Sequence, residues 1–375
     1  MSQPLKVLFI LPNLEGGGAE RVALTLLRFL DRKKVQPALY LLKRSGVYWN
    51  EVPDDIDIYY ASSERQRIRQ NLGVAFSNLS RLVKSSDVII GALELDATYF
   101  AYVWARLYDK PIIGWVHTLI QPYLSTVNKR HRALVKMIYP RLDRVIFPSD
   151  KSADSMLKFT RLERSKCQVV PNPLDLKKLY QLSVEELPSW ALKLYEKPIL
   201  ISVGRLEFEK GIDWLIRAHK ILLSKGLDNN LLILGEGRDR SAFEQLVKSL
   251  GVDNSVYMPG FISNPYPLIQ RAKIYFHGSL YEGFGLAIAE AQALGIPIIA
   301  FGNDTESPIL EGSIENIHLS ETSDDDLVSR ITELIEPSDR KKNMIHRGLS
   351  RVENLMPDKI AHEWETVFDE MSYEI

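Results

Sequence analysis

The sequence has very little cysteine: its 375 residues include one, Cys167. This excludes a disulfide framework and a cluster of thiolate metal ligands within the chain. The lack of a disulfide framework is typical of proteins in the reducing cytoplasm. We therefore predict a cytoplasmic protein. Cys167 stands beside Val169 and Val170, so we expect a small buried side chain there rather than a nucleophile.

Long apolar runs are also absent. No stretch approaches the roughly 20 apolar residues that a membrane-spanning helix needs. The N-terminus leads into the apolar run Val7–Leu11 without a following cleavage site, so we expect a first strand rather than a signal peptide. No known nucleic-acid-binding module is recognisable, and the net charge of −1 argues against a nucleic-acid partner.

The near-zero net charge hides an asymmetry. Residues 1–170 carry 26 Lys+Arg and 16 Asp+Glu, a net of +10, whereas the remainder carries 21 and 32, a net of −11. The basic first half suggests contact with an anionic surface. The length predicts two domains, and a hydrophobic fraction of 45% with 25% charged residues is typical of a globular protein.

Both halves alternate apolar runs with amphipathic stretches. Because buried parallel strands read as near-continuous apolar runs, this alternation predicts doubly wound α/β domains with parallel sheets. The expected strands are Val7–Leu11, Ala38–Leu42, Ile56–Ala61, Val88–Ala92, Ile112–His117, Val145–Pro148, Ile199–Val203, Leu231–Leu234, Val256–Met258, Ile274–Phe276 and Pro297–Phe301. Helices are expected at about 19–31, 67–84, 96–108, 129–139, 150–159, 211–224, 239–250, 265–272, 284–294, 324–336 and 357–375. Prolines cluster between Pro171 and Pro198, which places the junction there and predicts domains over 1–180 and 195–356.

The stretch 274–300 reads as strand, glycine loop, helix and strand. Glu282 lies in the loop, and Glu290 follows about two turns into the helix. Gly283 and Gly285 allow a ligand to approach the backbone, and the helix N-terminus offers N–H groups to a phosphate. We predict that this stretch binds a sugar attached to a diphosphate.

A second motif spans residues 204–211 and follows the first strand of the second half. Arg205 and Lys210 stand at a C-terminal strand end, where open α/β sheets bind ligands. Their guanidinium and ammonium groups suit phosphate oxygens. Taken alone, this motif could also be a solvated loop whose cations pair with Glu207 and Glu209. Because the Glu282 loop belongs to the same half of the chain, we favour the phosphate role.

A third motif, Gly16-Gly17-Gly18, follows the first strand and opens a helix. Its spacing is not that of a dinucleotide-binding fingerprint. Two interpretations stay open: backbone contact with an acceptor or phosphate, and a flexible turn with Glu20 in the first helical turn.

Two charged runs have simpler explanations. Asp324-Asp325-Asp326 follows Ser323, and helix capping explains it better than a metal site, so we predict no metal and no cofactor. The basic region 129–141 is expected to pack its apolar side on a sheet. Whether its charged side, with Arg65, Arg67 and Arg69, also meets an anionic membrane stays open.

The three motifs together resemble the retaining glycosyltransferases of family 4 (group 1), over nearly the whole chain. The resemblance implies two facing Rossmann-like domains with a central cleft, the GT-B fold. It also implies that the helix at 357–375 completes the N-terminal, acceptor-binding domain. The second domain would hold a nucleotide-sugar donor.

The resemblance further implies residue roles. Arg205 and Lys210 would bind the diphosphate, Glu282 the donor sugar and Glu290 the ribose. The implied catalytic residues are His117, Arg205, Lys210 and Glu282; the implied donor-binding residues are Gly17, Gly18, Asn172, Gly204, Arg205, Lys210, Gly235, Phe261, Ile262, Glu282, Gly283, Phe284, Gly285 and Glu290. Because His117 ends an expected strand, it would point into the cleft near the reacting sugar; a hydrogen-bonded strand-end histidine is the alternative.

The expected reaction is sugar transfer with retention and without metal. No residue clearly serves as a carboxylate nucleophile. We therefore expect attack from the leaving-group face, with Arg205 and Lys210 stabilising the departing diphosphate. The donor is expected to be UDP-linked and the acceptor a glycan or lipid-linked sugar, in bacterial surface polysaccharide or lipopolysaccharide synthesis.

Two alternative functions stay open: an inactive nucleotide-sugar-binding partner of a transferase, and a related sugar epimerase or phosphorylase. The cytoplasmic face of the inner membrane is an alternative location for a peripheral protein. Sugar and acceptor specificity would depend on loops 45–70 and 118–130.

Overall fold

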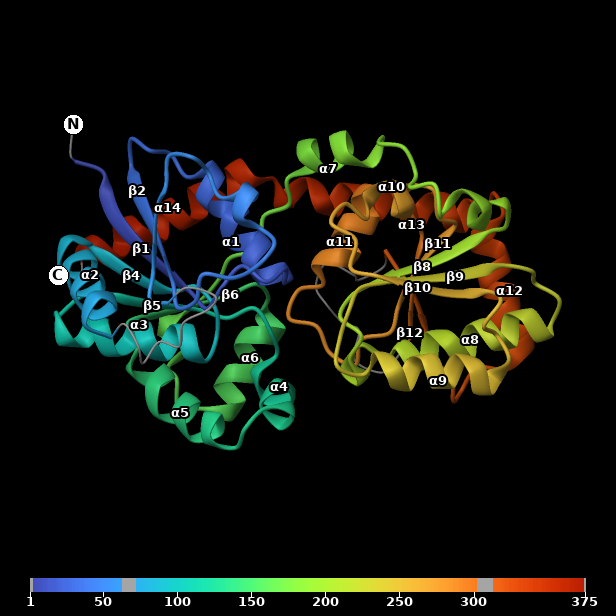
Figure 1. Cartoon of the computed structure of the whole chain (residues 1–375), viewed down its shortest axis with the longest axis horizontal. Coiled ribbons are helices and arrows are strands. Elements are labelled where there is room, and N and C mark those ends of the chain that lie inside the picture. The colour runs from blue at the N-terminus through green and yellow to red at the C-terminus, as the bar shows by residue number, and fades with distance from the viewer. Residues whose placement is uncertain (1–2, 63–71, 302–312, 374–375) are drawn as a thin grey trace. The chain divides into compact units, whose positions relative to one another are not determined.

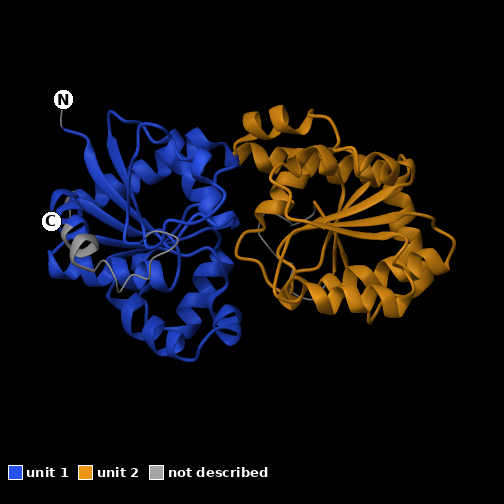
Figure 2. Ribbon diagram, viewed as in Figure 1, with its two compact units in different colours: residues 1–174, 355–375 blue, residues 175–354 orange. Residues whose placement is uncertain are grey.

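The computed structural model describes residues 3–62, 72–301 and 313–373. The chain divides into two compact units, coloured separately in Figure 2. Unit 1 comprises Met1–Leu174 and Leu355–Ile375, and unit 2 comprises Asp175–Asn354. Sequence reasoning placed the first boundary at residue 180. Unit 1 ends earlier because the helix Leu176–Ser183 packs against a helix of unit 2.

Unit 1 contains a 7-stranded parallel sheet in the order β3-β2-β1-β4-β5-β6-β7. Its strands are β1 (Leu5–Leu11), β2 (Val35–Leu41), β3 (Asp57–Tyr60), β4 (Val88–Gly91), β5 (Ile112–Trp115), β6 (Arg144–Phe147) and β7 (Cys167–Val169). Its described α-helices are α1 (Gly18–Phe29), α2 (Leu72–Ser85), α3 (Asp96–Leu107), α4 (Ile120–Thr126), α5 (Arg130–Ile138), α6 (Asp150–Phe159) and α14 (Pro357–Tyr373). Figure 1 shows α1 and α14 on one face of the sheet and α2 and α3 on the other.

Unit 2 contains a 6-stranded parallel sheet in the order β10-β9-β8-β11-β12-β13. Its strands are β8 (Ile199–Val203), β9 (Asn230–Leu234), β10 (Val256–Gly260), β11 (Ile274–His277), β12 (Ile298–Phe301) and β13 (Glu315–Ile317). Its described α-helices are α7 (Leu176–Ser183), α8 (Ile212–Ser224), α9 (Arg240–Leu250), α10 (Tyr266–Gln270), α11 (Leu286–Ala293), α12 (Asp324–Ile335) and α13 (Asp339–Val352). Helices α8 and α9 cover one face, and α10 and α11 cover the other (Figure 1).

The central strands are buried on both faces. Ile199, Leu200 and Ile201 of β8 are all fully inaccessible to solvent, as are the residues of β1 from Leu8 to Leu11. Burial on both faces explains why these strands read as continuous apolar runs rather than alternating ones. The predicted fold class, two doubly wound parallel-sheet domains, is confirmed.

The strand order reverses between β8 and β11 in unit 2. These two strands are neighbours in the sheet, while the chain connects them through β9 and β10 on one side. At such a reversal the loops leave the two strands in opposite directions and open a crevice beyond their carboxyl ends, which is where open α/β sheets bind ligands. Residues 204–211 follow β8 and residues 278–285 follow β11, so the two main motifs meet at this point.

The C-terminal helix α14 belongs to unit 1. Trp364 is fully buried, and its ring lies 4.5 Å from that of Trp115 on β5. Phe368 meets Phe9 of β1 edge to face at 6.3 Å. The apolar side of this last helix therefore completes the cover of the first sheet.

Candidate functional site

The loops that follow β8 and β11 are joined backbone to backbone. The N–H group of Leu280 donates a hydrogen bond to the carbonyl of Glu209 at 2.9 Å. Gly211 has a φ of +58°, and a Cβ there would lie 2.0 Å from the carbonyl oxygen of Gly278. Only glycine permits both the left-handed conformation and this approach. The backbone thus fixes the separation of the two loops.

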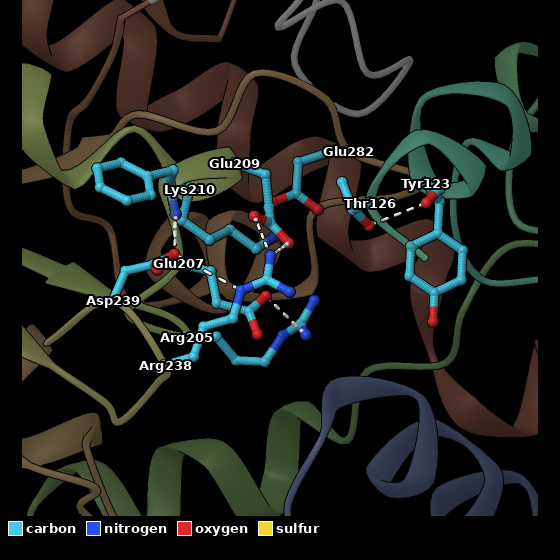
Figure 3. A network of polar contacts seen from close by, with 10 residues as sticks. Tyr123, Thr126, Arg205, Glu207, Glu209, Lys210, Arg238, Asp239 and Glu282 are labelled. Atoms are coloured by element: carbon cyan, nitrogen blue, oxygen red, sulfur yellow. Dashed lines mark hydrogen bonds and ion pairs between the residues drawn. The ribbon is translucent and has the colours of Figure 1, made fainter. Parts of the chain in front are cut away.

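An ion pair connects the same loops. The ammonium of Lys210 lies 2.7 Å from Oε1 of Glu282 (Figure 3). The hydroxyl of Ser279 donates to the same oxygen at 2.7 Å. Oε2 of Glu282 has no hydrogen bond to any residue that the structure describes. The side chain of Glu282 is 20% exposed. One carboxylate oxygen is therefore held, and the other is available to a ligand.

The electrostatics of Glu282 follow from these contacts. Burial acts to raise the pKa of Glu282, but Lys210, the nearby His277 and the two hydrogen bonds outweigh it and lower the pKa to about 2. Burial lowers the pKa of His277 to about 4. At neutral pH the cluster therefore holds an anionic Glu282, a cationic Lys210 and an uncharged His277.

Arg205 lies in the same loop as Lys210 but is more open to solvent. Its side chain is 59% exposed and pairs with Oε2 of Glu207 at 2.8 Å. Next to it, Arg238 reaches both oxygens of Glu209, at 3.2 and 3.0 Å (Figure 3). The alternative pairing from sequence analysis thus holds for Arg205 and Glu207, whereas Lys210 pairs with Glu282. Arg238 was not identified from the sequence, although it follows directly on the predicted loop of Gly235.

Glu290 occupies a different environment on α11. It is buried, and its Oε1 accepts a hydrogen bond of 2.7 Å from the hydroxyl of Tyr266 on α10. The helix was expected to begin near Phe284 but begins at Leu286, because Gly285 has a φ of +86° and stands outside the helix as its N-cap. Nothing in the sequence pattern identified Tyr266 as the partner of Glu290.

The remaining predicted residues of unit 2 lie at neighbouring strand ends. Gly204 follows β8, and Gly235 follows β9 and donates its N–H to the carbonyl of Gly260 at 2.9 Å. Phe261, the next residue, is exposed to 44%, and Ile262 is half-buried. The structure therefore brings these predicted donor-binding residues of unit 2 to one edge of the sheet.

Four predicted residues belong to unit 1. Gly17 is the N-cap of α1, and Gly18 is its first residue. A Cβ on Gly17 would lie 2.2 Å from Oε2 of Glu20. A side chain at this position would therefore clash with the buried Glu20, which is a structural reason for a glycine here. Asn172 is buried, and its Oδ1 has no hydrogen-bond partner among the described residues.

His117 does not end the strand as expected, because β5 stops at Trp115. The backbone N–H of His117 donates to Glu94 at 3.0 Å, and Nε2 contacts the carbonyl of Ala92 at 3.2 Å. Since a carbonyl can only accept, Nε2 carries the hydrogen and Nδ1 is left without a partner among the described residues. Burial lowers the pKa of His117 to about 4, so the ring is uncharged at neutral pH.

The structure accounts for the acidic run 324–326 and describes only part of the predicted basic surface. Ser323 caps α12 by accepting the N–H of Asp326 at 3.2 Å, and Asp326 pairs with Arg330 at 2.9 Å, which accounts for this acidic run as helix capping. Arg65, Arg67 and Arg69 lie outside the described residues. Among the residues that are described, no helix has the length and apolar character to cross a bilayer, and no group of three or more acidic, histidine or cysteine side chains is placed to hold a metal.

Solved structures share this two-unit architecture. Anabaena HepE in complex with UDP-glucose superimposes with a TM-score of 0.78 at 17% identity, covering 98% of this chain and 100% of that one. Sucrose-phosphate synthase from Thermosynechococcus elongatus gives 0.75 at 16% identity, covering 99% and 100%. The chain therefore has the GT-B fold of two-domain glycosyltransferases.

Family models match both units of the chain. The model described as Glycosyltransferase Family 4 matches residues 16–178, and that described as Glycosyl transferases group 1 matches residues 185–351. The protein belongs to the family 4 (group 1) glycosyltransferases, and the resemblance noted in the sequence is confirmed.

Two relatives match most of the chain. An N-acetylgalactosamine-N,N'-diacetylbacillosaminyl-diphospho-undecaprenol 4-alpha-N-acetylgalactosaminyltransferase of Campylobacter jejuni is 26% identical over 329 residues, 81% of this chain and 85% of its own length. An uncharacterised glycosyltransferase of Haemophilus influenzae is 25% identical over 370 residues, covering 96% and 99%.

The close approach of the two loops predicts a large effect of Gly211→Ala. Gly251, with a φ of +65° and no atom within 4 Å of the place that a Cβ would take, is the matched control. Gly251→Ala should cost only the roughly 1–2 kcal/mol of a left-handed residue. Gly211→Ala should cost about 1–3 kcal/mol more, because the Gly278 backbone must move. Urea unfolding measures both; equal losses would contradict the close packing.

The lowered pKa of Glu282 predicts a pH-dependent contribution to stability. A depressed folded-state pKa stabilises the protein above the ordinary value of 4.5, and this stabilisation is lost as the pH falls toward about 2. Glu282→Gln should therefore lower the free energy of unfolding at neutral pH, by an amount on the order of 2 kcal/mol, and by progressively less below about pH 4.5. Urea unfolding from pH 7 to 3 tests this, with the exposed Glu186→Gln as control. A pH-independent difference would show that the ion pair does not stabilise the loops.

Proposed function

We propose that this glycosyltransferase uses a nucleotide-diphosphate sugar, with UDP as the expected nucleotide, and transfers the sugar with retention of configuration and without a metal ion. The observation that carries the proposal is the meeting of Arg205, Lys210 and Glu282 at the strand reversal of unit 2. Cations for a diphosphate and a carboxylate for sugar hydroxyls stand there side by side, at the carboxyl ends of β8 and β11.

Each group has a role that its geometry supports. Arg205 is exposed enough to exchange Glu207 for a phosphate, and Lys210 adds a compact charge. The free Oε2 of Glu282 accepts a hydrogen bond from a sugar hydroxyl. The N-terminus of α11, which follows Gly285, adds N–H groups and the positive end of the helix dipole. Together these groups stabilise the charge that develops on the leaving diphosphate.

The other predicted residues extend this arrangement. Glu290, oriented by Tyr266, would bind the ribose hydroxyls. Phe261 and Ile262 would flank the base, with Gly235 lining the loop. In unit 1, the residues proposed to contact substrate are Gly17, Gly18, Asn172 and His117, and the neutral Nδ1 of His117 can only accept a hydrogen bond.

The acceptor proposed is a glycan or lipid-linked sugar in bacterial surface polysaccharide synthesis. The Campylobacter jejuni relative is named for an acceptor on diphospho-undecaprenol. Lys129, the N-cap of α5, and Arg130, Arg132 and Lys136 on the helix are exposed, while Val135 and Ile138 are buried. This basic face supports peripheral contact with an anionic membrane surface from the cytoplasmic side.

A nucleotide screen tests the proposal. UDP-, GDP-, ADP- and dTDP-sugars are added to the wild type in EDTA, and the thermal unfolding midpoint is followed. A ligand at about 100 times its Kd stabilises the native state by about 2.7 kcal/mol. We expect one nucleotide class to raise the midpoint, Arg205→Ala to abolish that rise, and Arg217→Ala, which removes an exposed cation from α8, to leave it unchanged.

The outcomes separate the candidate functions. Binding followed by transfer to a lipid-linked or glycan acceptor, with the anomeric configuration of the donor retained in the product, supports the proposal. Tight binding without transfer or hydrolysis supports a regulatory partner instead, and isomerised or phosphorolysed sugar supports the epimerase or phosphorylase. No midpoint shift with any nucleotide sugar would contradict donor binding at this site.

A further inference from the structure

His277 is a buried polar residue whose ring nitrogen Nε2 lacks a partner. It is the last residue of β11 and is 6% exposed. Its Nε2 is buried and has no hydrogen bond to any described residue. Oε1 of Glu282 lies 3.9 Å from Nε2, which is beyond hydrogen-bonding distance. A buried N–H or lone pair without a partner is costly, so its position next to the site needs an explanation.

The unliganded protein offers His277 no room on Oε1 of Glu282. Lys210 and Ser279 already occupy this oxygen, each at 2.7 Å. Glu282 and Lys210 are the charged groups that act on the ring of His277. The imidazole is uncharged, because burial lowers its pKa. Because a lone pair on Nε2 would be repelled by the nearby carboxylate, the tautomer with the hydrogen on Nε2 is favoured, and this N–H is close to the carboxylate but not bonded to it.

Diphosphate binding changes this balance, on the proposed function given above. The ammonium of Lys210 has three N–H donors, but sharing its charge between a phosphate and Oε1 of Glu282 weakens its contact with the carboxylate. When the ammonium turns to the phosphate, a largely buried carboxylate loses its main partner and also faces a new negative charge. Removing one partner from a buried ion pair is strongly destabilising, and like charges at short range add to the cost. Ser279 alone, a neutral donor, remains on Glu282.

We infer that His277 is a positioning residue that donates its Nε2–H to Glu282 when Lys210 engages the diphosphate of the donor. A movement of about 1 Å brings the N···O distance from 3.9 Å to the range of a charge-assisted hydrogen bond. The bond compensates the carboxylate for the loss of Lys210 and keeps Oε2 directed at the sugar. His277 acts through Glu282 and does not itself contact the donor.

The matched variants are His277→Gln and His277→Leu. Gln retains an N–H at a position similar to Nε2, whereas Leu has similar volume and no donor. His277→Met serves as a second apolar variant if Leu does not fold. The measurement is the Kd of UDP, GDP and ADP by calorimetry at neutral pH, with the thermal midpoint of each unliganded protein recorded beside it. Because the hydrogen bond forms only with ligand, the unliganded midpoint of no variant should fall more than about 3 °C below that of the wild type, and removal of the unpartnered nitrogen in the apolar variants can raise it.

The expected result is a Kd for one nucleoside diphosphate that is at least tenfold weaker in His277→Leu and within about threefold of wild type in His277→Gln. Wild-type affinity in the Leu or Met variant overturns the inference, and so does an equal loss in Leu and Gln, because neither depends on the N–H. A wild type that binds none of the three nucleotides overturns the proposed function itself, and this inference with it.

Discussion

The ion pair between Lys210 and Glu282 is the interaction on which the site depends. It joins the loops after β8 and β11, the two strands at which the sheet of unit 2 reverses its order. Lys210, His277 and the hydrogen bonds from Lys210 and Ser279 hold the pKa of Glu282 at about 2 despite its burial, yet its carboxylate keeps one oxygen available. The unliganded site is therefore neutralised internally, and an anionic ligand must compete for Lys210. On the proposed function, the affinity for a diphosphate would depend on what replaces Lys210 on the carboxylate, which is the role inferred for His277 beside Ser279.

The backbone sets the position of this pair. Gly211 and Gly278 approach one another so closely that no side chain fits between them, and the hydrogen bond from Leu280 to Glu209 holds the same two loops. The two loops that carry the charged side chains are consequently held at a fixed separation. Such preorganisation limits the rearrangement that a diphosphate requires on binding. The geometry of the site therefore depends on how the loops after β8 and β11 pack together, and not only on a few motif residues.

Much of the fold could be predicted because buried parallel strands leave a direct trace in sequence. Ile199–Val203 was predicted with the bounds it has in the structure, whereas β7 and β13, of 3 residues each, were missed because so short a run carries no clear pattern. Lys210 and Glu282 could be named from loop chemistry, but their mutual contact depends on strand order, which periodicity does not encode. Tyr266 and Arg238 were missed for the same reason: each reaches the site from another element. Strand β5 ends at Trp115, before His117, which shows that the sequence pattern does not fix the last residue of a strand.

A crystal structure with the nucleoside diphosphate that binds most tightly would test the central claim most directly. We predict that phosphate oxygens lie within hydrogen-bonding distance of Arg205 and of Nζ of Lys210. The Arg205–Glu207 pair should have opened, and the 2.7 Å contact between Lys210 and Glu282 should have lengthened. A diphosphate bound elsewhere, with both ion pairs intact, would contradict it.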